Sequence, residues 1–311
     1  MALPLLRKNS QNGTVGLDID GRYVAAVQAS GSRIAKAASS ELPEGLVADG
    51  EVVDVEGLST ALKSFASEVG LPRNVRLGVA NQQIVMRLIE LPAIDDATER
   101  DAAVRFQASE AIAMPLDEAV LDYDVVGYGE APDGARRMRV VVVAARQSMV
   151  EAVAQAARGA GLRPEGIDLD AFALVRMLAE ESQEEQDEQA RVYCHLGGVT
   201  NLAIATGTTC LFSRPLSTAW DGEHAVDTLA DEIRLSLDYY MAQPNARPAV
   251  ELVLSGPGCH DEELVKGLGI RLGLETAAAP PLGKLDSSAL GPDEDPRRYT
   301  VAAGLAIGAA A

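Results

Sequence analysis

Apolar and polar residues alternate over three short stretches near the start of the chain, and a helical repeat follows them. Alternation with a period of two is typical of strands that bury one face. The alternating stretches are residues 15–20, 23–29 and 32–42. The helical repeat, over 56–69, carries on one face Leu58, Leu62, Phe65 and Val69. This part of the chain therefore predicts three strands in a sheet with a helix packed on it.

The middle of the chain predicts a small α+β unit of its own over about 76–166. Asp95 and Asp96 are residues that commonly cap the start of a helix, and an apolar stripe at helical spacing follows them. The stripe consists of Val104, Ala108, Ala111 and Ile112. Two further strands flank the turn Pro132-Asp133-Gly134, and a second helix is expected over 147–158.

The pattern that opens the chain returns in its second half, after an acidic stretch over 183–190 that predicts a solvated linker. Three strand patterns cover 191–198, 200–207 and 208–217. A long helix then carries an apolar face made of Val226, Leu229, Ala230, Ile233, Leu237, Tyr240 and Met241. A strand, a helix over 262–272, a loop over 278–297 and a final helix complete the chain. One architectural theme thus occurs twice.

Composition narrows the class of protein. The chain has 311 residues, 47% of them hydrophobic, which is enough for one large core or two lobes. Its 46 acidic residues outnumber its 27 lysines and arginines, and a formal charge of −19 disfavours binding to nucleic acid or to anionic lipid.

The apolar segments at the two ends of the chain are too short for a signal peptide or a membrane span. We therefore expect a cytoplasmic protein that meets a membrane only through a partner. Cys194, Cys210 and Cys259 form no CxxC pair, and we expect them to be small core residues in a reducing compartment.

The run that begins LPAIDDATER at Leu91, with IVMRLIELP overlapping its start and YDVVGY after it, resembles the inserted subdomain of the PilM family of type IV pilus assembly proteins. That family is itself similar to the division protein FtsA. The resemblance implies an α/β, actin-like (ribonuclease H-like) two-lobed fold with an inserted α+β subdomain and a reduced fourth subdomain.

The resemblance also implies a division of the chain into domains. A flexible N-terminus covers 1–13, and the first lobe covers 14–75 and 167–182. The inserted subdomain covers 76–166, and the acidic linker covers 183–190. The second lobe covers 191–311, and the reduced fourth subdomain within it covers 221–243.

Three loops match those with which actin-like proteins hold ATP and Mg²⁺. The resemblance aligns Asp18 with an acidic residue near the metal and Gly21 with a turn that faces the phosphates. In the second hairpin it implies phosphate contacts from Gly197, Gly198, Thr200 and Asn201. In the third loop it places Gly256 and Gly258 beside the adenosine. A plain tight turn with no ligand is an equal alternative for the second hairpin.

The same loops depart from the family pattern. Asp20 stands where the family has a glycine, and a carboxylate that faces a triphosphate repels it unless a metal intervenes. His195 replaces an aspartate, although Mg²⁺ prefers oxygen ligands, and Pro257 removes an N–H donor. We therefore expect ATP binding that is weak or lost. We expect no hydrolysis, because no general base or intact metal site is visible.

The resemblance implies a partner as well, namely the cytoplasmic N-terminal tail of a PilN-like membrane protein within a pilus assembly complex. The strand expected beside this tail contains Val85, Arg87, Leu91 and Pro92. Recognition by strand addition would suit an extended peptide there. The alternative is that Val85 and Leu91 belong to the core and Arg87 is solvated.

Two other functions stay open from the sequence. The first is an active ATPase or a sugar-kinase-like phosphotransferase of the same fold, which would require an acidic residue at the position of His195. The second is an FtsA-like filament, which should carry an amphipathic membrane helix that is not apparent at Ala309-Ala310-Ala311.

Overall fold

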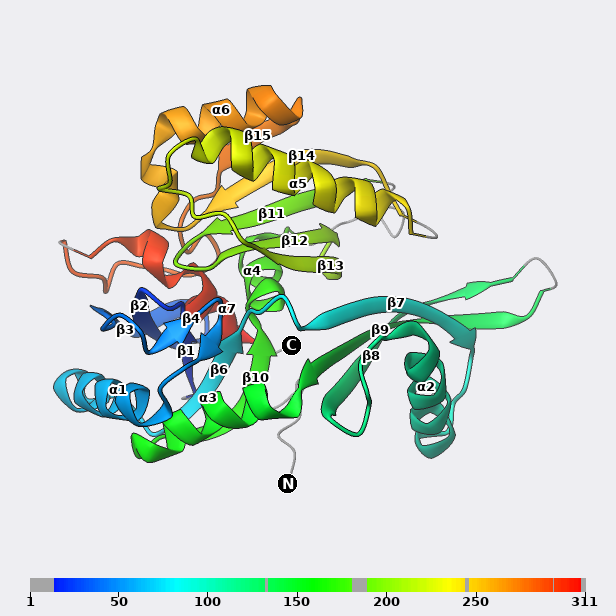
Figure 1. Cartoon of the computed structure of the whole chain (residues 1–311), viewed down its shortest axis with the longest axis horizontal. Helices are drawn as coiled ribbons and strands as arrows, with labels where there is room; N and C mark the ends of the chain where they lie inside the picture. Colours follow the sequence, from blue (N-terminus) through cyan, green and yellow to red (C-terminus); the bar gives the residue numbers. More distant parts are fainter. Residues whose placement is uncertain (1–13, 132–133, 181–188, 244–245, 293, 309–311) are drawn as a thin grey trace.

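Two lobes, each built on a five-stranded sheet, make up most of the molecule (Figure 1). The structure, a computed structural model, describes residues 14–131, 134–180, 189–243, 246–292 and 294–308. The first sheet has the order β10-β6-β1-β2-β3. Its strands are β1 (Val15–Ile19), β2 (Tyr23–Ser30), β3 (Arg33–Glu41), β6 (Asn74–Val79) and β10 (Arg163–Leu169). Strand β1 pairs antiparallel with β2 and parallel with β6.

The second sheet repeats this plan in the order β13-β12-β11-β14-β15. Its strands are β11 (Ala190–Leu196), β12 (Thr200–Thr206), β13 (Thr209–Leu216), β14 (Ala249–Ser255) and β15 (Glu275–Ala278). Here β11 pairs antiparallel with β12 and parallel with β14. The predicted internal repeat is therefore confirmed, whereas the short strand β15 was not predicted.

Helices cover the outer faces of both sheets and fill the space between them (Figure 1). On the first lobe, α1 (Val55–Val69) packs against α3 (Gln147–Gly159). On the second lobe, α5 (Ala225–Met241) packs against α6 (Glu262–Leu272). Helix α4 (Asp170–Leu178) contacts strands of both sheets, and it packs against α7 (Thr300–Ile307).

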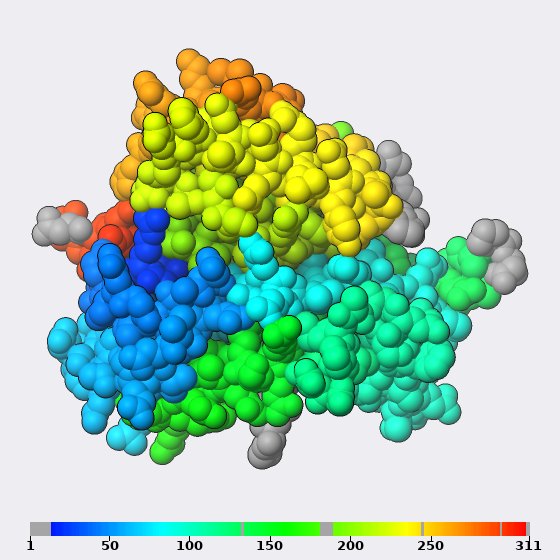
Figure 2. Space-filling view, viewed as in Figure 1, coloured from blue at the N-terminus to red at the C-terminus, as the bar shows by residue number. Residues whose placement is uncertain are grey.

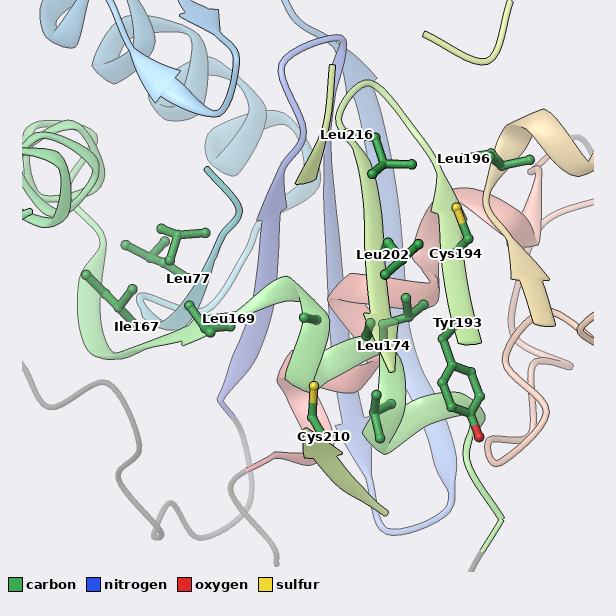
Figure 3. Close-up of a cluster of buried hydrophobic side chains, with 14 of the residues drawn as sticks. Leu77, Ile167, Leu169, Leu174, Tyr193, Cys194, Leu196, Leu202, Cys210 and Leu216 are labelled. Atoms are coloured by element: carbon green, nitrogen blue, oxygen red, sulfur yellow. The ribbon is translucent and has the colours of Figure 1, made fainter. Parts of the chain in front are cut away.

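A continuous apolar core joins the two lobes (Figure 3). The largest hydrophobic cluster contains residues of both lobes. The first lobe contributes Leu77, Ile167 and Leu169, and the second contributes Tyr193, Leu196 and Leu202. Leu174 of α4 belongs to the same cluster. Cys194, Cys210 and Cys259 are free and buried in this cluster, which confirms their expected role as small core residues.

The inserted subdomain is smaller than the predicted range 76–166. It consists of β7 (Val85–Pro92), α2 (Ala97–Ala111), β8 (Ala119–Glu130) and β9 (Arg136–Arg146), and its sheet has the order β7-β9-β8. Strands β6 and β10 belong to the first sheet, and α3 packs on α1. Helix α2 is capped by Asp96, whose carboxylate accepts the N–H groups of Thr98 and Glu99 at 2.9 Å. Asp95 does not cap this helix.

The C-terminal helix differs from the prediction that all of 191–311 forms the second lobe. Helix α7 packs on β1, β2 and β6 of the first sheet, and Tyr299, Ala302 and Ala303 share a cluster with residues of β2. The approach is close: a Cβ built on Gly16 of β1 would lie 2.0 Å from the carbonyl oxygen of Ala302. The chain therefore returns to its first lobe after completing the second.

Smaller elements complete the fold. In sequence, the pair β4 (Val47–Ala48) and β5 (Glu51–Val52) lies between β3 and α1. Two 3₁₀ helices lie in the second half of the chain: η1 (Pro257–His260) precedes α6, and η2 (Pro296–Tyr299) precedes α7. The predicted apolar face of α5 is correct except at Met241, which is 46% exposed.

Some predictions fall partly or wholly outside the described residues. They are the N-terminus 1–13, the turn residues Pro132 and Asp133, and most of the linker 183–190, whose last residue, Ala190, begins β11. In the part of the chain that the structure describes, no helix has the length and apolar character needed to cross a membrane.

Candidate functional site

The turns of the two repeated hairpins meet between the lobes, and Asp20 joins them. One carboxylate oxygen, Oδ2, accepts the N–H of Gly198 from the second lobe at 2.5 Å. The other, Oδ1, accepts the N–H groups of Arg22 at 3.1 Å and Tyr23 at 3.3 Å in its own hairpin. Asp20 is only 5% exposed. A single buried carboxylate therefore binds backbone donors of both hairpins.

Asp18 and Gly21, the residues predicted in the first loop, lie on either side of Asp20. Asp18 is buried on β1, and its Oδ2 has no hydrogen-bond partner among the described residues. Gly21 has a φ of 92°, a conformation that favours glycine and lets the turn form. The loop thus has the predicted residues, with a charged side chain placed between them.

A third carboxyl group, Asp170, completes an acidic cluster with Asp18 and Asp20. It begins α4, and a Cβ on Gly78 would lie 2.1 Å from its Oδ1, so Gly78 leaves room for it. Burial, and then the charges of Asp20 and Asp168, raise the pKa of Asp170 to about 8. Burial, and then Asp170 and Asp20, raise the pKa of Asp18 well above its usual range. With a pKa of about 8, the Asp170 carboxyl retains its proton at neutral pH.

Sequence reasoning missed Asp170. The signal was an acidic residue at the junction of a strand and a helix, in the sequence IDLDAF. Asp168, two residues earlier, serves a different purpose, because its carboxylate forms an ion pair with Arg176 at 3.0 Å.

Of the four residues predicted in the second hairpin, the two glycines face the first loop. A Cβ on Gly197 would lie 2.7 Å from Asp20 Oδ2, and one on Gly198 would lie 2.5 Å from Asp20 Oδ1. Thr200 instead donates its hydroxyl to the carbonyl of Thr218 at 3.0 Å. Asn201 is buried and lines a separate cavity of about 10 Å³ between the lobes. The hydroxyl of Thr200 is therefore used within the second lobe.

His195 is a buried strand residue. Its Nδ1 lies 3.0 Å from the hydroxyl oxygen of Ser255, its partner in the β11–β14 register. Burial lowers the pKa of His195 to about 4, so the ring is neutral near pH 7. The described residues contain no group of three or more histidine, cysteine or acidic side chains that could hold a metal ion.

The third loop is covered by the segment between β13 and α5. Gly256 has a φ of 91°, and a Cβ there would lie 2.7 Å from the carbonyl oxygen of Leu196. A Cβ on Gly258 would lie 2.8 Å from the ring of Trp220. Arg22 of the first lobe forms a two-pronged ion pair with Asp221 at 2.6 and 3.0 Å. Gly256 therefore lies against the backbone of Leu196, and Gly258 lies against the ring of Trp220.

Three features of these loops bear on the binding of a magnesium nucleotide. The N–H of Gly198, a donor that would face a phosphate, is bound to Asp20. The cavity lined by Asp20 and Asp170 has a volume of about 20 Å³, which is room for a single water molecule. Trp220 packs against Gly258 at the expected adenosine side.

The predicted partner strand, β7, lies at the edge of the inserted sheet. Among the described strands it pairs with β9 alone. It also contacts β13 of the second lobe, and Gln82, just before it, donates to the hydroxyl of Ser217 at 2.9 Å. In Figure 2 the insertion, coloured cyan to green, abuts the second lobe in yellow.

The four residues named for the partner groove have different environments. Leu91 is buried in the core of the inserted subdomain, and Val85 packs against that core. Arg87 is half-buried, and its guanidinium carbon lies 6.0 Å from the ring centroid of Tyr239 on α5. Pro92 is exposed. Arg87 is therefore the member of the set that reaches the second lobe.

Two sheets of equivalent topology, with helices between them and with the turns of their first hairpins meeting between the lobes, define an actin-like fold. Within that class, the chain belongs to the PilM family. A family model described as "Type IV pilus assembly protein PilM" matches residues 16–217.

Solved structures agree on the fold. The chain is similar to one from the "PilM-PilN type IV pilus biogenesis complex", with 24% identity, a TM-score of 0.78, and coverage of 96% of this chain and 99% of that chain. It is also similar to the ethanolamine utilization protein EutJ from Carboxydothermus hydrogenoformans. That match has 12% identity, a TM-score of 0.51, and coverage of 97% of this chain and 92% of that chain.

Proposed function

We propose that this protein is a docking scaffold of the type IV pilus assembly complex at the inner membrane. In this role it binds the cytoplasmic N-terminal tail of a PilN-like membrane protein, laid in extended form along β7. The observation that carries the proposal is that β7 is an edge strand of the inserted sheet and runs beside the second lobe. Membership of the PilM family and similarity to a chain from the "PilM-PilN type IV pilus biogenesis complex" support it.

An edge strand suits an extended peptide for a simple physical reason. It presents a row of backbone N–H and C=O groups that an added strand can pair with, and its side chains form alternate pockets. Arg87 lies where such a peptide would meet the second lobe, because its guanidinium stacks over Tyr239. The tail would thus contact the inserted subdomain through its backbone and the second lobe through side chains.

Docking does not require a working nucleotide site, and we propose that binding of ATP and Mg²⁺ is weak or lost. Asp20 already binds the N–H of Gly198, and a cavity of about 20 Å³ cannot hold a triphosphate. The formal charge of −19 opposes direct contact with anionic lipid or nucleic acid. The protein would therefore sit at the membrane through its partner.

The test is a calorimetric titration of the whole protein with a synthetic tail of the PilN-like protein. Arg87→Ala should weaken binding about tenfold, or about 1.4 kcal/mol, because it removes the contact between β7 and α5. The matched control is Arg136→Ala. That arginine also stacks on a tyrosine, at 4.6 Å, but its partner, Tyr128, belongs to β8 of the insertion and not to the second lobe, so loss of its side chain should leave the affinity unchanged.

A second form of the tail tests the mode of binding. N-methylation of alternate backbone amides on the peptide edge that faces β7 removes donors without changing side chains, and strand addition predicts a large loss of affinity. Equal affinity for the methylated tail, or equal effects of Arg87→Ala and Arg136→Ala, would contradict docking along β7.

One observation favours a second candidate, an active ATPase of the same fold. Asp18 and Asp170 are buried carboxyls whose Oδ2 and Oδ1 atoms, respectively, lack partners among the described residues, and such groups are common in active sites. This candidate requires stoichiometric, magnesium-dependent binding of ATP, which the same calorimeter can detect.

A further inference from the structure

The hydrogen bond from Gly198 to Asp20 crosses between the two lobes at the centre of the cleft. Its donor belongs to the turn after β11, and its acceptor belongs to the turn after β1. These two turns occupy equivalent positions in the two repeats. The contact is therefore a direct link between equivalent loops. Asp20, whose side chain makes it, is only 5% exposed.

The chemistry of this link is that of a bound anion. Backbone N–H groups of hairpin turns form concave sites that attract anionic oxygens. The carboxylate of Asp20 accepts three such donors, from Gly198, Arg22 and Tyr23. Gly197 and Gly198 have no side chains, so the carboxylate can approach their backbone closely.

We propose that the Asp20 carboxylate is a built-in anion that occupies the place of an external phosphate group between the two hairpin turns and holds the lobes together without a ligand. This inference rests on one part of the proposed function, namely that binding of ATP and Mg²⁺ is weak or lost. It does not depend on the partner tail, so tail binding and the role of Asp20 can fail separately.

A second bridge between the lobes, from Arg22 to Asp221, lies outside the first. Its side chains are 44% and 43% exposed, so water and salt screen it. The Asp20 bond is buried and is screened much less. The outer pair therefore provides a control, because Asp221 also joins the lobes, through the guanidinium of Arg22, but accepts none of the three backbone N–H groups that Asp20 binds.

The experiment measures binding of inorganic tripolyphosphate with Mg²⁺, by calorimetry, to the whole protein and to two variants. Asp20→Ala removes the built-in anion and frees the N–H of Gly198, so it should bind tripolyphosphate at least about tenfold more tightly than the unaltered protein. Asp221→Asn breaks the outer bridge alone and should bind no better than the unaltered protein. Hydrogen exchange at the Gly198 amide should be at least about tenfold faster in Asp20→Ala.

Several outcomes would overturn the proposal. One is tight tripolyphosphate binding by the unaltered protein, and another is no gain in Asp20→Ala. A gain in Asp221→Asn equal to that in Asp20→Ala would assign the effect to lobe opening in general. If Asp20→Ala does not fold, Asp20→Asn, which keeps the size and one acceptor, should show a smaller gain. An unprotected Gly198 amide in the unaltered protein would contradict the bond itself.

Discussion

The buried carboxyl of Asp170 gives the folded protein a specific pH dependence. Its pKa is about 8 in the folded state, against an ordinary value of 3.8 for an exposed aspartate. The folded state therefore binds this proton more tightly than the unfolded state does. Stability from this group is fully present below about pH 4 and is lost as the pH rises through 8.

Asp170→Asn should remove this dependence, because an amide needs no proton to stay neutral. We expect the variant to be more stable than the unaltered protein by about 1–3 kcal/mol at pH 8, with a smaller difference at pH 5. Urea denaturation at the two pH values measures this. Asp117→Asn, which changes an exposed aspartate, is the control and should leave both values unchanged. An equal effect of Asp170→Asn at both pH values would contradict the assignment.

For single residues, the sequence could predict which of them form the two hairpin turns. It could not predict which side chain lies between the turns. Gly21 forms the first turn with a φ of 92°, and Gly197 and Gly198 lie against Asp20. Asp20 was recognised only as an obstacle to phosphate, because its acceptor role depends on a donor 178 residues away. The phosphate contact predicted for Thr200 stays a prediction, and in the structure its hydroxyl donates to the carbonyl of Thr218.

Among the elements, helix α7 depends on two close backbone approaches. A Cβ on Gly304 would lie 2.0 Å from the carbonyl oxygen of Ala173 in α4, and Gly16 approaches Ala302 equally closely. Such contacts allow α7 to pack between the first sheet and α4. Small residues are therefore required at these positions.

Gly304→Ala should destabilise the protein by about 1–3 kcal/mol, although alanine is ordinarily the better helix residue, because the added methyl group overpacks the contact with α4. Gly129→Ala is the matched control. That glycine has no atom within 4 Å of a built Cβ, so the substitution should cost nothing measurable. Thermal unfolding of both variants decides this, and equal midpoints would contradict the packing described for α7.

The pattern of apolar residues predicted most elements but not their sheet partners. The helix expected over 262–272 matches α6 at both ends. Strand β6 was assigned to the insertion because it precedes β7 in sequence, whereas it pairs with β1 and β10. Local periodicity does not reveal which strand lies next to which, and it does not show that α7 returns to the first lobe.

For the whole molecule, the repeated halves predicted two lobes, and the structure adds how tightly they are joined. A shared apolar cluster, the Asp20 bond and the Arg22–Asp221 pair all cross between them. No spacing rule in the sequence could indicate this closure, since each contact joins residues far apart in the chain. A scaffold built this way should present β7 in one fixed position relative to α5.

If the protein docks an extended tail without using a nucleotide, Mg-ATP should leave the affinity for that tail unchanged. The most direct measurement is the affinity of the whole protein for the PilN-like tail with and without Mg-ATP. Docking without a nucleotide predicts specific binding whose dissociation constant is the same within about twofold in both conditions. No binding in either condition, or an affinity that Mg-ATP changes by about tenfold or more, would contradict it.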